Sequence, residues 1–158
     1  MDYNKLPGLS QKHMTDWLAE GLAPDSPMRT QGLIATIQPS FISCDFEKGT
    51  ALFSIPVTEW SLNPLGVMHG GVAISAFDTA LGILCHYYQQ PYVLTTISID
   101  TYFLKPVYAG STLYVEAKIN NLGRSLVTLS GKMWVEDETE LTNICTAVFK
   151  VLHGKKRA

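Results

Sequence analysis

Charged residues are scarce in this chain, and several common functional motifs are missing from it. Asp, Glu, Lys and Arg make up 16% of its 158 residues and leave a formal net charge of −2. This balance gives no support for a nucleic-acid partner, which selects for basic surfaces. The sequence also has no glycine-rich phosphate loop and no dinucleotide-binding fingerprint. Nucleotide-dependent enzymes of those two kinds are therefore not indicated.

Metal-ligating residues and cysteine pairs are equally sparse. The four histidines have no metal-ligand spacing, so we expect no metal site: His13, His69, His86 and His153. The three cysteines are an odd number without close spacing, and we expect free thiols at Cys44, Cys85 and Cys145. Cys85 lies in an apolar segment, where a free cysteine packs as a small hydrophobe. This usage indicates a reducing compartment.

Long hydrophobic runs are absent as well. Residues 70–88 come closest to a membrane span, but an Asp, several glycines and hydroxyl side chains interrupt them. The first five residues include two charged side chains and have no apolar signal core. The sequence thus predicts a cytoplasmic protein that does not enter a membrane.

The chain has the length and composition of one globular domain, residues 1–158, with 46% hydrophobic residues. Met14, Trp17, Leu18 and Leu22 recur at helical spacing, which predicts a short amphipathic helix over residues 10–21, within an N-terminal extension at about 9–22. The core, at about 32–152, begins with three strand-like segments: 32–38, 41–46 and 50–57. A loop over 58–68 leads to a long helix at 70–89.

After that helix, apolar residues alternate with polar or small ones at a period of two, which is typical of strands. The predicted strands are 92–104, 111–120, 125–136 and 141–152. Short turns between them predict an antiparallel meander. In the first strand, Ile97, Ile99 and Phe103 are expected on one face and Thr96 on the other. A helix that is apolar all round must be wrapped, and a curved antiparallel sheet can do this. We therefore predict an α+β fold, with a long central helix, a curved sheet and a short extra N-terminal helix.

The most informative stretch runs from Asn63 through His69-Gly70-Gly71 into this apolar helix, whose one formal charge is Asp78. Burying an ionised carboxylate is unfavourable unless a partner or a reaction uses it. Glycines at a helix start leave backbone N–H groups accessible at the positive end of the helix dipole. Together these features indicate hydrolysis of an activated carbonyl, with the N–H groups binding the oxyanion.

The spacing of these groups has a further consequence. Gly70 and Asp78 are eight residues apart, about 12 Å along a helix, so one carbonyl carbon cannot touch both within one subunit. If both act on one substrate, they come from different chains. The sequence therefore predicts a site shared between two subunits.

A set of residues in this order resembles the hotdog-fold acyl-CoA thioesterases, in particular the PaaI-like (phenylacetate-degradation) branch: Asn63, Gly66, His69-Gly70-Gly71, Asp78-Thr79-Ala80, Thr96 and Phe103-Leu104-Lys105-Pro106. The resemblance covers about residues 33–152. It implies a hotdog fold, a homodimer with a sheet continuous across both subunits, often paired into a homotetramer, and hydrolysis of an acyl-CoA at the dimer interface. Coenzyme A then enters as part of the substrate, and no cofactor is expected.

Carried over residue by residue, the resemblance implies that Asp78 is the catalytic carboxylate and that the Gly70 amide binds the thioester oxygen. Asn63 and His69 would shape or support the site, and Thr96 would position the water or the acid. The sequence does not separate a general base from a nucleophile at Asp78.

Several alternatives stay open. Gly70 and Gly71 admit a close substrate, or they only let the helix end pack tightly. Asp78 could instead cap a backbone group or pair with a lysine. Arg124 follows a turn, where it contacts a coenzyme A phosphate or only solvent. The competing functions are a non-catalytic acyl-CoA sensor or carrier and a hotdog hydratase or dehydratase. Nothing in the sequence dictates an aryl or an aliphatic acyl group, or its length.

Overall fold

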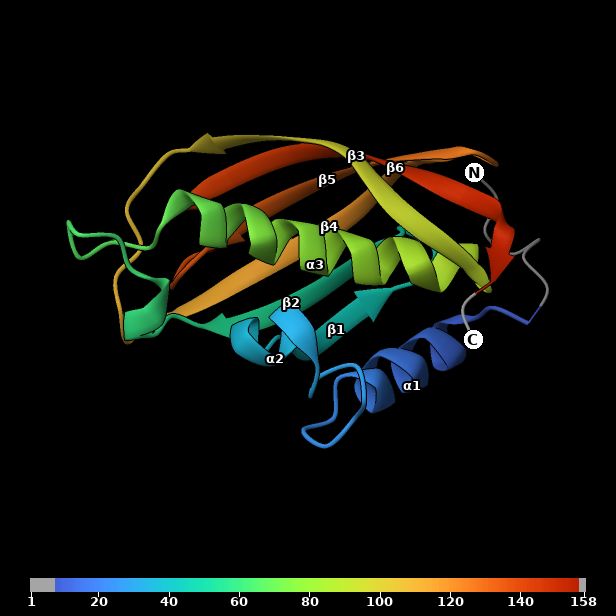
Figure 1. Cartoon of the computed structure of the whole chain (residues 1–158), viewed down its shortest axis with the longest axis horizontal. Coiled ribbons are helices and arrows are strands. Elements are labelled where there is room, and N and C mark those ends of the chain that lie inside the picture. Colours follow the sequence, from blue (N-terminus) through green and yellow to red (C-terminus); the bar gives the residue numbers. More distant parts are fainter. Residues whose placement is uncertain (1–7, 157–158) are drawn as a thin grey trace.

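One antiparallel sheet of six strands curves around a single long helix. The computed structural model describes residues 8–156; the start of the chain, where the sequence predicts no signal segment, lies outside the described residues. The elements are α1 (Gln11–Gly21), α2 (Gly32–Ile37), β1 (Ser40–Asp45), β2 (Thr50–Pro56), η2 (Glu59–Ser61), α3 (Gly70–Gln89), β3 (Tyr92–Phe103), β4 (Thr112–Leu122), β5 (Leu126–Trp134) and β6 (Asn143–Lys156). Figure 1 shows α3 lying across the sheet. The predicted α+β architecture is confirmed.

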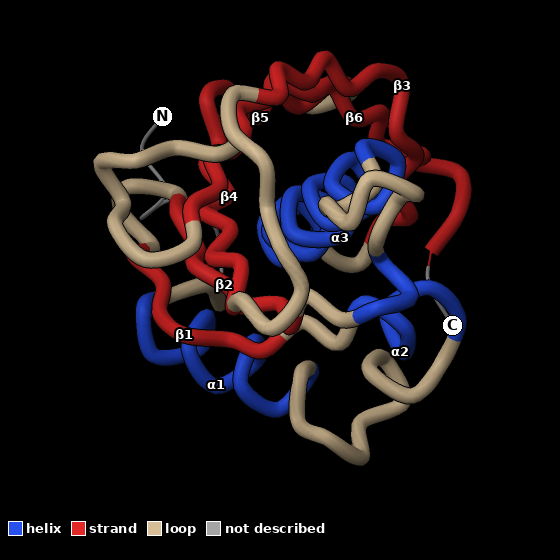
Figure 2. Tube along the Cα trace, turned by 90° about the vertical axis from the view of Figure 1, so that its left-hand side faces the viewer, coloured by secondary structure: helices blue, strands red, loops and turns tan. Residues whose placement is uncertain are grey.

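The strands are ordered β1-β2-β4-β5-β6-β3, and each neighbouring pair is antiparallel. Viewed along α3, the sheet bends around the helix on two sides and leaves a third side open (Figure 2). The predicted meander is correct for β4, β5 and β6 but wrong for β3, which pairs with β6. Alternation identifies a strand without naming its partner, and the connection from β3 to β4 is too long for a tight hairpin.

Helix α3 covers residues 70–89 as predicted, and its large side chains fill the concave side of the sheet. The fully or nearly buried positions are Ala73, Ala76, Phe77, Ala80, Leu81, Ile83, Leu84, Cys85, Tyr87 and Tyr88. The sheet wraps the helix as predicted but does not cover it on every side within one subunit. A stripe of partly exposed positions recurs every three or four residues, at Gly71, Ile74, Asp78, Gly82 and His86. The sheet does not reach this side of the helix, so Asp78 is half-buried rather than enclosed.

The predicted strand at 32–38 is also wrong, because residues 32–37 form the short helix α2. Among the residues of α2, Ile37 is buried, whereas Leu33 is exposed and Ile34 is half-buried, so this short helix anchors itself to the core through its last residue. Gln38 then takes a left-handed backbone conformation (φ 54°) and Pro39 follows, which ends the turn and lets β1 begin at Ser40.

A bulge in β3 changes which side chains face α3. The pairing with β6 shifts register between Thr96 and Ser98, and an inserted residue reverses the alternation beyond it. Thr96 therefore shares the helix-facing side with Ile99 and Phe103, whereas the prediction placed it on the opposite face. Ile97, expected in the core, is 55% exposed.

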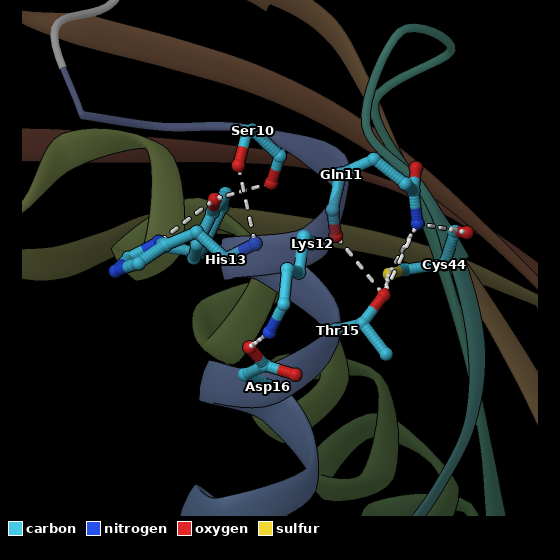
Figure 3. A network of polar contacts seen from close by, with 8 residues as sticks. Ser10, Gln11, Lys12, His13, Thr15, Asp16 and Cys44 are labelled. Carbon is cyan, nitrogen blue, oxygen red and sulfur yellow. Dashed lines mark hydrogen bonds and ion pairs between the residues drawn. The ribbon is translucent and has the colours of Figure 1, made fainter.

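Helix α1 is fastened to β1 and to the end of α3. Ser10 caps it by accepting a hydrogen bond from the His13 N–H. Gln11 bridges to the end of β1: its Nε2 donates to the Cys44 carbonyl (3.1 Å), and its Oε1 accepts from the Phe46 N–H (2.8 Å). Figure 3 shows the Gln11–Cys44 contact. The Tyr87 hydroxyl of α3 donates to the Ser10 carbonyl. The N-terminal segment is thus held in a defined place.

Replacing Gly131 by alanine is expected to lower the free energy of unfolding by about 1–3 kcal/mol. An added Cβ would lie 2.8 Å from Phe77 Cδ1 and 2.9 Å from Cys145 Sγ, so α3 could no longer approach β5 as closely. Urea unfolding measures the effect. Gly154→Ala is the matched control in a strand, because its added Cβ meets nothing within 4 Å. Equal stability of the two variants would contradict this packing.

Candidate active site

Asp78 and Thr96 form a hydrogen-bonded pair on the open side of α3. The Thr96 hydroxyl donates to Asp78 Oδ1 at 2.7 Å. Asp78 is half-buried and Thr96 is exposed. Among the side chains that the structure describes, residues 8–154, no lysine or arginine forms an ion pair with Asp78, and the carboxylate caps no backbone group. The two structural alternatives for this carboxylate, a cap or an ion pair, therefore find no support. One oxygen is oriented by Thr96 and the other can contact water or a ligand.

The second group of predicted residues lies at the N-terminus of α3. His69 caps the helix, because its Nδ1 accepts a hydrogen bond from the Gly71 N–H at 2.9 Å. While Nδ1 caps the helix it cannot act as a base, and a neutral ring carries its proton on Nε2. The Gly70 N–H, one residue earlier, has no acceptor among the described residues. It is a free donor at the positive end of the helix dipole.

Gly70 also lies against an aromatic ring. A Cβ added there would lie 3.2 Å from Phe103 Cζ, so a side chain is poorly accommodated. Gly70 lines a pocket of about 400 Å³ together with Asn63, Lys105 and Asn143. Asn63 Oδ1 accepts hydrogen bonds from the backbone N–H groups of Leu65 (2.9 Å) and Val67 (3.4 Å). Asn63 therefore shapes the loop that forms one wall of this pocket.

The Asp78 carboxylate lines a different pocket, of about 480 Å³. Neither Asp78 nor Thr96 contributes to the pocket at Gly70, and Gly70 does not contribute to theirs. Along α3 the two positions are about 12 Å apart. Within a single subunit, the structure thus keeps the amide and the acid in separate pockets.

Arg124 lies at the other end of the helix from Gly70. It is exposed in the turn between β4 and β5, and the neighbouring Gly123 carbonyl accepts a hydrogen bond from Gln89, the last residue of α3. Arg124 lines neither pocket. The structure therefore brings Asn63, His69, Gly70 and Gly71 together, pairs Asp78 with Thr96, and leaves Arg124 apart from both groups.

Sequence reasoning missed several residues of these pockets. Asn143, only 3% exposed, and Phe103 lie beside Gly70. Phe103 is part of the resemblance without an assigned role, and no motif marks Asn143. Residues from the N-terminal segment lie in the Asp78 pocket: Trp17, Met28, Leu33 and Ile34. The incorrect strand prediction for 32–38 gives no reason to place Leu33 and Ile34 at the open side of α3.

The cysteines are free, as the spacing predicts. Burial raises the pKa of the Cys85 thiol to about 12, and burial also raises that of Cys145 to about 12. Both are core residues, which confirms packing for Cys85. Across residues 8–156, no group of three His, Cys, Asp or Glu side chains is placed to hold a metal ion. In the same range, no helix combines the length and apolarity needed to cross a bilayer.

Known proteins share both the sequence and the shape of this region. The sequence model of the thioesterase superfamily matches residues 65–142, from the loop before α3 to the turn before β6. Over these residues the chain resembles the thioesterase superfamily. Acyl-coenzyme A thioesterase PaaI of Escherichia coli is 33% identical over 78 residues, which are 49% of this chain and 54% of that protein. A second relative, from Saccharolobus solfataricus, is matched over 60% of its length. The chain thus spans little more than half the length of these curated relatives.

Solved structures extend the likeness to nearly the whole fold. The E. coli PaaI protein from the phenylacetic acid degradation operon superposes with a TM-score of 0.73 and 21% identity, over 90% of this chain and 96% of that one. The smu.793 protein of Streptococcus mutans, solved with bound acetyl CoA, has a TM-score of 0.64 and 23% identity over 75% and 92% of the two chains. These structures confirm the predicted hotdog fold.

Replacing His69 by alanine is expected to lower the free energy of unfolding by roughly 0.5–2 kcal/mol, because the Gly71 N–H loses its acceptor. His69→Asn should lose much less, since asparagine is a favourable N-cap residue. Urea unfolding of the two variants provides the comparison. If both lost the same stability, the cap would not be the source of the effect.

Proposed function

We propose that this chain is an acyl-CoA thioesterase, which hydrolyses the thioester of a small or medium acyl-CoA to a free acid and coenzyme A. The observation that carries the proposal is the Asp78 carboxylate, oriented by Thr96 and open to a pocket, on the same helix as the free N–H of Gly70. The match of residues 65–142 to the thioesterase superfamily and the similarity to PaaI support it. So does the related Streptococcus mutans structure with bound acetyl CoA.

In the proposed reaction the Gly70 N–H donates to the thioester oxygen and stabilises the negative charge that develops there. Asp78 then acts by one of two routes. As a base, it takes a proton from a water molecule whose oxygen attacks the carbonyl carbon. The C–S bond breaks when the intermediate collapses, and the sulfur leaves with that proton. As a nucleophile, its carboxylate attacks the carbonyl carbon, the C–S bond breaks and coenzyme A leaves as a thiolate. Water then hydrolyses the resulting anhydride, which releases the free acid, restores the Asp78 carboxylate and supplies the proton that the thiolate takes up.

The remaining predicted residues serve this reaction indirectly in the proposal. Thr96 holds one carboxylate oxygen, so the other is aimed at the water or the carbonyl. His69 and Asn63 fix the helix start and the loop around Gly70. Gly71 leaves room for the substrate, and Arg124 binds a coenzyme A phosphate. Coenzyme A is part of the substrate, and the reaction uses water and groups of the chain without a cofactor.

The site is proposed to form between two subunits. The 12 Å between Gly70 and Asp78, and their separate pockets, require a second copy if both act on one carbonyl. In the described sheet, β3 is an end strand with a free edge and exposed apolar side chains, including Ile97 and Tyr102. Pairing of two such edges would make a homodimer with a continuous sheet. We place the protein in the cytoplasm, in keeping with its three free cysteines, and expect dimers to pair into tetramers.

The contribution of the Gly70 N–H can be isolated with two substitutions at that position. Gly70→Pro removes the N–H and is tolerated in the first helical position, and the extended backbone of His69 suits a following proline. We expect kcat to fall by about 10²–10³. Gly70→Ala adds a Cβ near Phe103 but keeps the N–H, so its kcat should fall much less. Thiol release from acyl-CoAs is the assay, and equal losses would assign the effect to crowding.

The shared site is tested by mixing two inactive variants. Asp78→Asn and Gly70→Pro are each expected to release almost no thiol as homodimers. A heterodimer of the two, isolated through two different affinity tags, would hold one unaltered site and one doubly altered site. It should recover about half of the wild-type activity. A folded heterodimer without activity would overturn the shared site, and acyl-CoA binding by wild type without thiol release would indicate a sensor or carrier instead.

A further inference from the structure

The pocket at Asp78 is built from two parts of the chain that lie far apart in the sequence. Its inner side consists of the open stripe of α3, with Asp78 and Gly82, and of β3. Its outer side comes from the N-terminal segment: Trp17 of α1, Met28, and Leu33 and Ile34 of α2. Figure 2 shows α2 on the side of α3 that the sheet leaves uncovered. This segment lies before residues 65–142, which match the superfamily model.

The lining of this pocket is sorted by polarity. Asp78, Thr79 and Thr96 group three polar side chains near the middle of α3, His86 adds a polar ring further along the helix, and the N-terminal wall is apolar. Leu33 is 52% exposed and belongs to neither the buried core nor the side chains packed against it. Apolar walls with a few grouped polar atoms are typical of small-molecule sites. The arrangement fits a ligand with a polar reacting end and an apolar body.

Gly82 widens the pocket one helical turn beyond Asp78. A glycine inside a helix is unfavourable compared with alanine, and the packing here does not require one. A Cβ added to Gly82 would meet Phe149 Cε1 at 3.6 Å and Cζ at 4.0 Å, which are ordinary contacts. The missing side chain therefore leaves room in the pocket beside Phe149, without serving the packing of the helix itself.

The pocket is large compared with an acetyl group. Its volume is about 480 Å³, whereas one water molecule occupies about 30 Å³ of liquid. An acetyl group would displace only one or two such water molecules. From Asp78 past Gly82 to His86, the pocket follows α3 for about 12 Å, so a longer apolar group would be in contact along its whole length.

We propose that this pocket binds the acyl group of the substrate, and that Gly82 and Leu33 make the protein selective for apolar acyl groups of medium length over acetyl. The assignment rests on the thioesterase function proposed above. The carbonyl lies at the Asp78–Thr96 end, and the acyl chain runs along α3 between Gly82 and the wall formed by α1 and α2.

Binding of S-decyl-coenzyme A, a thioether that cannot be hydrolysed, tests the pocket separately from catalysis. By calorimetry, wild type should bind S-decyl-coenzyme A at least about tenfold more tightly than coenzyme A. Gly82→Leu fills the pocket and should reduce this preference to about twofold or less, with coenzyme A binding unchanged. A folded Gly82→Leu protein that keeps the full preference would overturn the assignment.

A second pair of variants covers the case in which Gly82→Leu does not fold. Leu33→Ala should weaken S-decyl-coenzyme A binding about fivefold. Leu126→Ala is the matched control, because Leu126 is 48% exposed and lines neither pocket. Equal effects of the two substitutions would exclude Leu33 from the site.

Thiol release from acetyl-, hexanoyl- and decanoyl-CoA separates this inference from the proposed function. If wild type hydrolyses all three at equal kcat/KM and shows no preference for S-decyl-coenzyme A, the thioesterase function holds and the acyl pocket is rejected. If S-decyl-coenzyme A binds tightly and Gly82→Leu weakens it, but no acyl-CoA is hydrolysed, the pocket holds and the thioesterase function is rejected.

Discussion

The regular rise of α3 fixes the Gly70 N–H and the Asp78 carboxylate about 12 Å apart, and the surrounding structure follows from that separation. Helical hydrogen bonding leaves no freedom to bring the two groups together. Phe77 packs tightly over Gly131 and holds α3 against the concave sheet, so the helix cannot tilt easily. The residues that surround Gly70 and Asp78 can vary, whereas the distance between these two positions cannot.

The elements that the sequence predicts well are those with strong local signals. Apolar continuity and the His69-Gly70-Gly71 start define α3, and Ser10 with its apolar spacing defines α1. The β3 pairing and bulge could not be predicted, because alternation carries no information about partners or inserted residues. The β-branched side chains of residues 32–37 favour a strand locally. The short helix α2 nevertheless buries Ile37, as a strand also could.

The residues of the candidate site also fall into those with a local sequence signal and those that only the tertiary fold brings together. The acid and the helix start were found because a charge in an apolar helix and a glycine pair are local signals. The Asp78–Thr96 hydrogen bond joins positions 18 residues apart and depends on the bulge, so alternation alone placed Thr96 on the wrong face. Asn143 and the N-terminal pocket residues have no signal at all, because only the tertiary fold carries them to α3. Aromatic residues at the helix end, such as Tyr87, pack against α1 instead of lining a pocket.

Residues on α1 and α2 close the pocket at Asp78, although the segment shared with the superfamily begins only at residue 65. The wall and the acid are therefore encoded by separate stretches of the gene. Mutations in the first stretch can reshape the cavity while the hydrogen bonds around Asp78 and Gly70 stay intact. Such a division separates the part of the chain that shapes the cavity from the part that holds the reacting groups.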